Sequence, residues 1–276
     1  MGISIDNIEH YMNLFQDRNE QFPHTGWAEP IYAAMIRSYQ SHEGLTVTIG
    51  NEYIRNMILS RYRPNNTYSP IETIMGRMGI EAISSHITNI MLQNFTLLSP
   101  TDQKDLRDYL QYLFIELMNN VVDHSHSPVG GYAMAQYFPK GRRIQFVVAD
   151  RGVGFLDNIR INYHDIVTEE QAIIKAFEKG VTSTRQTMYN VQKNAGYGLY
   201  AMLEILQMTG GKFVVISNDS MVRYNGSVLE SKQLEYPWEG VVVSFEFYEA
   251  KINYDMDYFR RTHLWGVDLG EDEDFF

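Results

Sequence analysis

The stretch from Asp102 to His124 constrains the fold more than any other part of the sequence. Apolar side chains recur along it at intervals of three or four residues, at Leu106, Leu110, Leu113, Leu117 and Val121. This spacing places them on one face of a helix, and that face must pack against another element to leave water. The preceding residues, Ser99-Pro-Thr-Asp102, are typical of a helix start. A long amphipathic helix is therefore predicted over residues 102–124.

The residues that follow predict strands for this helix to cover. Two apolar runs, 131–138 and 143–149, flank Pro139-Lys-Gly-Arg142, and this arrangement is typical of a hairpin. Residues 198–208 have helical periodicity and end at Gly210-Gly211. Further strands are predicted at 212–217, 221–224 and 241–248. The pattern predicts an α/β fold with helices on one face of a mixed or antiparallel sheet.

The chain divides into three parts by pattern. Residues 1–100 are predicted to form a smaller α/β or mostly α region at the N-terminus. Residues 101–250 hold the helices and strands described above, and residues 251–276 form a C-terminal extension. The acidic end of this extension is typical of a solvated tail, and the alternative is a partner-binding peptide anchored by Phe275 and Phe276. Within the first part, helices are predicted at 9–15, 30–39, 51–62 and 71–98, with an interruption near Gly79, and a short strand at 44–50.

Charge and composition exclude several classes of protein. Lys and Arg total 23 and Asp and Glu total 34, which gives a net charge of −11 and argues against a long contact with nucleic-acid phosphates. The 276 residues include no cysteine, so neither a disulfide scaffold nor a cysteine-ligated zinc site can form. No apolar run approaches the roughly 18 residues of a membrane helix, and the N-terminus lacks the features of a signal peptide. We therefore expect a cytoplasmic protein that contacts neither nucleic acid nor membrane.

Polar side chains border the apolar face of the long helix. Glu116, Asn120 and Asp123 fall within a narrow arc, because a helix turns by about 100° per residue. An asparagine oxygen can bind a hard cation such as Mg²⁺, and a partly buried glutamate can orient or deprotonate a water molecule. The polar border of an ordinary amphipathic helix contains the same residue types, so this group alone does not indicate a site.

Two glycine-containing motifs follow along the chain. Asp150-Arg-Gly152-Val-Gly154 comes directly after the strand predicted at 143–149. A carboxylate there can accept a hydrogen bond from an exocyclic amine, and the glycines let the backbone approach a ligand. The second motif, Lys193-Asn-Ala-Gly196-Tyr-Gly198-Leu199, precedes a predicted helix, and a helix N-terminus favours phosphate. Each motif alone is also typical of an ordinary turn.

The three motifs together indicate a family. Glu-x-x-x-Asn on a helix, Asp-x-Gly-x-Gly at a strand end and Gly-x-Gly-Leu before a helix occur in this order, over about residues 102–250. This set resembles the GHKL superfamily, the ATP-binding domains of DNA gyrase, histidine kinases, mismatch-repair ATPases and anti-sigma-factor serine kinases. The resemblance implies a two-layer α/β sandwich with a mixed sheet, the Bergerat-type ATP-binding fold, and implies ATP and Mg²⁺ as cofactors.

The resemblance also implies roles for individual residues. Glu116 is similar to the family's general base, and Asn120 to its Mg²⁺ ligand. Asp123 and His124 would line the site beside the nucleotide, and Asp150 would bind the adenine amino group. The remaining positions would bring backbone or positive charge close to the base, sugar and phosphates, and they are Gly152, Gly154, Lys193, Gly196, Gly198 and Leu199.

The sequence departs from the family pattern at two points. Family members often carry a threonine after a glycine on a late strand, where this chain has Val241, and Ser244 is a candidate replacement. No phosphoacceptor-histidine helix pair is recognisable, and the nearest candidate is His86. A helical histidine is more often structural or solvated than a phosphate acceptor.

Two functions are consistent with these motifs. The first is a regulatory ATPase or protein kinase that resembles the stand-alone anti-sigma-factor type, in which residues 1–100 would bind a regulator or present a substrate. The retained Glu116 favours catalysis over simple binding. Residues 156–195 would form its lid over ATP, with Lys193 and Arg185 as phosphate contacts on charge alone. The alternative is a nucleotide-responsive interaction module with little or no turnover. ATP or ADP and a protein partner or substrate are expected, and a homodimer is left open.

Overall fold

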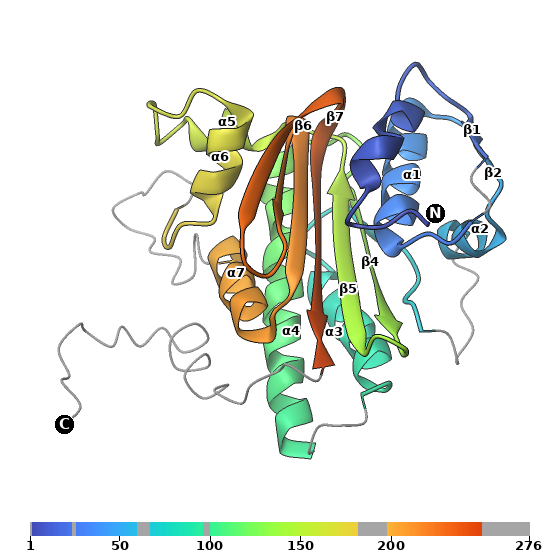
Figure 1. Cartoon of the computed structure of the whole chain (residues 1–276), viewed down its shortest axis with the longest axis vertical. Coiled ribbons are helices and arrows are strands. Elements are labelled where there is room, and N and C mark those ends of the chain that lie inside the picture. The colour runs from blue at the N-terminus through green and yellow to red at the C-terminus, as the bar shows by residue number, and fades with distance from the viewer. Residues whose placement is uncertain (1, 24–25, 60–66, 96–99, 182–197, 250–276) are drawn as a thin grey trace.

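A computed structural model describes residues 2–23, 26–59, 67–95, 100–181 and 198–249 (Figure 1). The acidic tail therefore lies outside the described residues. The centre of the fold is a five-stranded sheet, whose strands follow one another across the sheet in the order β3 (Glu72–Ile74), β4 (Gly131–Phe138), β5 (Arg143–Asp150), β7 (Leu229–Tyr248) and β6 (Lys212–Tyr224). A small second sheet pairs β1 (Gln21–Phe22) with β2 (Thr48–Ile49) in parallel. The predicted α/β class is confirmed.

The sequence pattern predicted a mixed or an antiparallel sheet, and the antiparallel alternative is confirmed for the five-stranded sheet, because all of its described neighbours pair antiparallel. The mixed sheet that the family resemblance implied is wrong for this sheet. Hairpins join β4 to β5 and β6 to β7, and a hairpin imposes the antiparallel direction. The connection from β5 to β6 contains helices, and a connection of this kind could have joined two neighbouring parallel strands. However, β7 lies between these two strands and pairs with both of them, so they do not meet.

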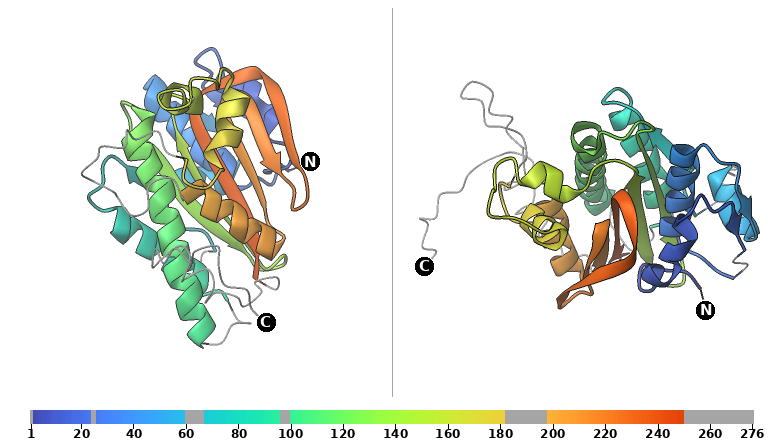
Figure 2. Two further views of the ribbon diagram at one scale, coloured as in Figure 1. Left: turned by 90° about the vertical axis from the view of Figure 1, so that its left-hand side faces the viewer. Right: turned by 90° about the horizontal axis from the view of Figure 1, so that it is seen from above.

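One face of the sheet is covered by helices (Figures 1 and 2). These helices are α3 (Ile80–Leu92), α4 (Pro100–Asn120), α5 (Phe155–Ile159), α6 (Glu169–Ala176) and α7 (Gly198–Thr209). The apolar stripe predicted on the long helix is buried against this face from Leu106 to Val121. Although α4 has 21 residues, neither it nor any other helix within the described ranges is long and apolar enough to cross a membrane.

The opposite face is covered by the N-terminal residues, whereas helices on one face only were predicted. This layer contains η1 (Ile8–Phe15), α1 (Pro30–Glu43) and α2 (Glu52–Ile58), which form a second apolar core with the sheet. Trp238 of β7 is fully buried in it, with its ring centroid 5.4 Å from that of Phe15. The central strands are therefore buried on both sides.

The main core extends across residue 100. The short strand β3 pairs with β4, and α3 packs along α4, so residues before position 100 complete the sheet and its helical layer. The prediction of helix over 71–98 is wrong at residues 72–74, which form β3. It is confirmed for α3, which starts directly after Gly79.

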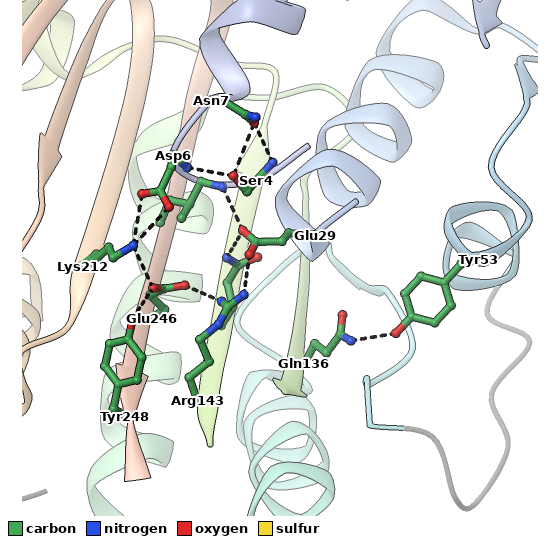
Figure 3. A network of polar contacts seen from close by, with 12 residues as sticks. Ser4, Asp6, Asn7, Glu29, Tyr53, Gln136, Arg143, Lys212, Glu246 and Tyr248 are labelled. Carbon is green, nitrogen blue, oxygen red and sulfur yellow. Dashed lines mark hydrogen bonds and ion pairs between the residues drawn. The ribbon is translucent and has the colours of Figure 1, made fainter. Parts of the chain in front are cut away.

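A buried ionic network joins the N-terminal layer to the sheet (Figure 3). Arg143 of β5 pairs with Glu29 at 2.6 Å and also with Glu246 of β7. The second oxygen of Glu29 accepts hydrogen bonds from Ile5 N at 2.8 Å and Gln145 Nε2 at 2.7 Å. Glu29 and Glu246 have side chains that are 2% and 3% exposed, so each requires its partner to remain charged in the core.

Candidate functional site

One cavity brings together most of the residues that the sequence indicated. It lies between α4, the end of β5, the start of α5 and the start of α7, and its empty space, counted with the open mouth, is about 870 Å³. The predicted site residues that line it are Glu116, Asn120, His124, Asp150, Gly154, Gly198 and Leu199. Most of the other lining side chains are apolar, among them Leu117, Val148, Phe155, Ile159 and Val241. The cavity is thus an apolar space with a few polar groups, which is typical of a small-molecule site.

Asp150 presents one free acceptor to this cavity. Its side chain is at the end of β5, and the residue is only 3% exposed. Oδ1 accepts hydrogen bonds from Gly152 N at 2.9 Å and Val241 N at 3.3 Å, and Oδ2 accepts none from any described residue. Burial raises the pKa of Asp150 to about 7, although the two backbone hydrogen bonds and Arg151 oppose this. A ligand that donates a hydrogen bond would complete the carboxylate.

An Asp150→Asn variant should gain stability over the ligand-free wild-type chain as the pH rises. The unfolded carboxyl ionises near 3.8 and the folded one near 7, so the wild type loses stability between these values as it must ionise a buried group. The neutral amide has no such loss. Urea unfolding at pH 5 and pH 8 should show the variant's advantage growing by about 3 kcal/mol, since roughly two pKa units of the shift lie between these pH values and one unit is about 1.4 kcal/mol. If the difference in stability between the variant and the wild type did not change with pH, a raised pKa of Asp150 would be contradicted.

Glu116 and Asn120 occupy successive turns of α4 on the cavity wall. Neither side chain hydrogen-bonds to any described residue, so both are available to a ligand. Burial, with a smaller contribution from the charge of Asp123, raises the pKa of Glu116 to about 7, while Arg77 opposes the rise. A carboxyl that ionises near neutral pH is well matched to proton transfer. The amide oxygen of Asn120 is a ligand type that Mg²⁺ accepts.

Gly198 allows the start of α7 to approach Glu116. A Cβ atom at this position would lie 2.9 Å from Glu116 Cβ, closer than two carbon atoms can pack. Glycine is therefore required here by the packing of α7 against α4. Leu199, the next residue, is buried and lies against the same cavity.

A Gly198→Ala variant should lose about 1–3 kcal/mol of stability, since the added methyl group forces α7 away from α4. Because Glu116 is the residue displaced, any phosphate release by the chain should fall about tenfold or more. Thermal unfolding and phosphate release measure the two effects. Gly141→Ala is the matched control, because its added Cβ would lie no closer than 3.6 Å to Arg143. Equal losses in the two variants would contradict the packing argument.

Asp123 lies outside the group of residues that lines the cavity. It is exposed, and both of its oxygens accept hydrogen bonds from one nitrogen of Arg77, at 2.7 and 2.8 Å. This contact joins the loop after β3 to η2 (Val121–Ser125), a π-helical turn that continues α4. The π-helical turn changes the direction of the side chains after Asn120. The predicted arc of an α-helix therefore holds for Glu116 and Asn120 and does not extend to Asp123. Asp123 stays close enough to influence the charge of Glu116.

Gly152 is also absent from the cavity wall. A Cβ atom there would lie 1.9 Å from the carbonyl oxygen of Ser125. The neighbouring Val153 N donates to the same oxygen at 2.7 Å. This glycine is therefore required by packing of the β5–α5 turn against η2, while Gly154 two residues later does line the cavity.

Other predicted residues have different positions. Lys193, Gly196 and Arg185 lie outside the described residues, as does the part of the predicted lid after residue 181. Its first part forms α5 and α6. Ser244, the predicted replacement for a threonine, does not line the cavity. It is buried, and its Oγ donates to Phe146 O at 3.1 Å. Val241 lines the cavity, and its backbone N donates to Asp150 Oδ1 at 3.3 Å. His86 is on α3, half exposed and 3.0 Å from Glu72.

Sequence reasoning missed two further features of the site. Asn158 of α5 lines the cavity and donates to the carbonyl oxygens of His124 and Gly154, at 3.0 and 3.1 Å. Nothing in the sequence pattern marks this residue. Burial lowers the pKa of His124, which favours its neutral form beside the ligand space. Within the described ranges, no three His, Asp or Glu side chains converge on a metal position.

Comparisons with protein-family models, with curated proteins and with solved structures found no match for this chain. The geometry of the cavity and the motifs that line it are therefore the observations that bear on what the chain binds.

Proposed function

We propose that this chain binds ATP with Mg²⁺ in the cavity and acts as a regulatory ATPase or protein kinase of the GHKL type. In this proposal the five-stranded sheet and the helices on its first face form a two-layer α/β sandwich of the Bergerat type, and the N-terminal residues add a third layer on the opposite face. The observation that carries the proposal is the convergence of three distant motifs on one cavity. Glu116 and Asn120 come from α4, Asp150 from the end of β5, and Gly198 from the start of α7. Coincidental motifs would have no reason to meet at one place.

The polar groups present fit the two cofactors. The free oxygen of Asp150 would accept a hydrogen bond from the adenine amino group, and Val148 and Val241 would contact the base and exclude water. Asn120 would hold Mg²⁺ through its amide oxygen. When bound, the ion supplies neutralisation of phosphate charge, which is the main requirement of phosphoryl transfer. Glu116 would orient the attacking water or hydroxyl group and accept its proton.

Incubation of the purified chain with Mg²⁺ and γ-labelled ATP tests the proposal. Free labelled phosphate would identify an ATPase, and label retained on protein would identify a kinase with itself as one substrate. Binding of ATP is measured in parallel by calorimetry. A folded chain with no affinity for ATP, with or without Mg²⁺, would refute the proposal.

A second candidate is a nucleotide-responsive interaction module with little turnover. Arg151, the residue after Asp150, is buried. Its guanidinium carbon lies 4.6 Å from the centre of a Trp238 ring and 5.6 Å from the centre of the ring of Tyr39 in α1. The strand that carries the ligand-binding carboxylate thus contacts the N-terminal layer directly. ATP binding without free phosphate or labelled protein would favour this candidate over the enzyme.

A further inference from the structure

A buried carboxylate next to the cavity connects three elements of the fold. Glu169 is the first residue of α6, directly after the N-cap residue Thr168, and it is 6% exposed. Its Oε1 accepts a hydrogen bond from Phe155 N at 2.6 Å, and its Oε2 accepts one from Leu156 N at 3.3 Å. These two N–H groups belong to the first turn of α5 and have no partner within that helix. The carboxylate therefore caps α5 from a distance.

The same carboxylate is bonded to the edge strand β6. Ser217 Oγ donates to Oε1 at 2.5 Å, and Asn218 Nδ2 donates to Oε2 at 3.2 Å. The pairing register with β7 shifts on both sides of Asn218, whose φ is +47°. A bulge of this kind redirects a side chain, and here it turns the amide of Asn218 towards Glu169. Four donors from two elements thus meet one buried anion.

This cluster also explains the second glycine of the Asp-x-Gly-x-Gly motif. A Cβ atom on Gly154 would lie 2.4 Å from Glu169 Oε1 and 2.2 Å from Asn218 Nδ2. Any side chain at this position would separate the carboxylate from its donors. Glycine at position 154 thus leaves room for the carboxylate of Glu169, and it also leaves the backbone accessible to a ligand.

We propose that Glu169 is a positioning residue that sets the shape of one wall of the cavity. The wall consists of Gly154, Phe155, Asn158, Ile159 and Ala176, all on α5, α6 or the residue before α5. Glu169 fixes these elements to β6 through four charge-assisted hydrogen bonds, which are stronger than neutral ones. The inference rests on the proposed function in that it takes the ligand of this wall to be a nucleotide.

The position of Glu169 determines which property should change when it is altered. Its hydrogen bonds reach α5 and β6, whereas Glu116 and Asn120 belong to α4. Loss of the carboxylate should therefore weaken nucleotide binding and leave the chemical step unchanged. A purely structural role would lower the folded fraction, and hence the apparent kcat, without changing KM.

The test compares Glu169→Gln with Glu170→Gln in the full chain. Glu170 is the matched control, because it is the adjacent residue of α6, is exposed and bonds only Ser231 among described partners. For Glu169→Gln we expect the Kd for ATP and the KM to rise about tenfold, the result of losing 1.4 kcal/mol of binding free energy. kcat should stay within about twofold of the wild-type value. Hydrogen exchange at the amides of Phe155 and Leu156 should accelerate, even without nucleotide.

Three outcomes would overturn the inference. If Glu169→Gln binds ATP with the wild-type Kd, the role of Glu169 is refuted and the proposed function is not affected. If the wild-type chain has no affinity for ATP, both the role of Glu169 and the proposed function are refuted. If Glu169→Gln does not fold, Ser217→Ala and Asn218→Ala each remove one donor and should each raise the Kd about threefold. An unchanged Kd in both of these variants would be the third contradicting result.

Discussion

A Glu116→Gln chain should bind ATP as the wild type does and release phosphate at least a hundredfold more slowly. Glutamine keeps the size of the side chain but cannot accept a proton, and a general base contributes about 10²–10⁴ in rate. The pKa of Glu116, raised to about 7, suits a base at neutral pH. Binding should persist, because Asp150 and the apolar wall are unaltered. Calorimetry with ATP and a phosphate-release assay measure the two properties.

Asp108→Asn is the matched control for this variant. Asp108 is on the same helix and exposed, and it does not line the cavity. Its replacement should leave both binding and phosphate release unchanged. Equal turnover in Glu116→Gln and wild type would exclude Glu116 as the base, even if ATP binds. Loss of ATP binding in Glu116→Gln would instead give Glu116 a role in holding the ligand.

Elements defined by local pattern could be predicted from the sequence. The hairpin of β4 and β5 was predicted within one residue of its bounds, because each strand is an apolar run flanked by turn residues. The start of α7 at Gly198 was found for the same reason. Elements defined by distant contacts were missed. β3 has three residues and is a strand only because it pairs with β4, almost sixty positions later.

The sequence also contains a signal for the second layer on the sheet, in the residues of β5. Residues 144–149 form a nearly continuous apolar run, which is typical of a strand buried on both faces. Alternation would have indicated a sheet with one face in water. The run predicts that something covers the second face, but it does not identify the N-terminal residues as the cover.

The site was predictable to the extent that a residue's role follows from its own motif. Glu116, Asn120 and Asp150 line one cavity, as the resemblance implied. Asp123 was assigned to the ligand, but it bonds Arg77, 46 residues earlier in the chain. Glu169 was not singled out, since its Ser217 partner is 48 residues away. Partners at such distances leave no periodic trace in a single sequence.

Replacing Arg143 with alanine should lower the free energy of unfolding by about 3–5 kcal/mol, the usual result of removing one partner from a buried charge pair. Both Glu29 and Glu246 would lose their guanidinium in the core between the N-terminal layer and the sheet. Urea unfolding at pH 7 measures the loss. Much of it should be the penalty of an unpaired carboxylate, so the double variant Glu29→Gln, Arg143→Met should recover part of the stability. Glu246 would keep Lys212, 3.5 Å away.

Arg142→Ala separates this effect from a general sensitivity of the hairpin. Arg142 is the neighbouring residue, exposed in the turn between β4 and β5, so its replacement should change stability by no more than about 0.5 kcal/mol. Comparable losses for Arg142→Ala and Arg143→Ala would show that the ionic network does not hold the N-terminal layer. A large loss for Arg143→Ala alone, partly reversed in the double variant, would show that these residues stabilise the sheet through paired charge. The network would then be a stabilising polar link between the residues that cover the second face and the strand that ends in Asp150.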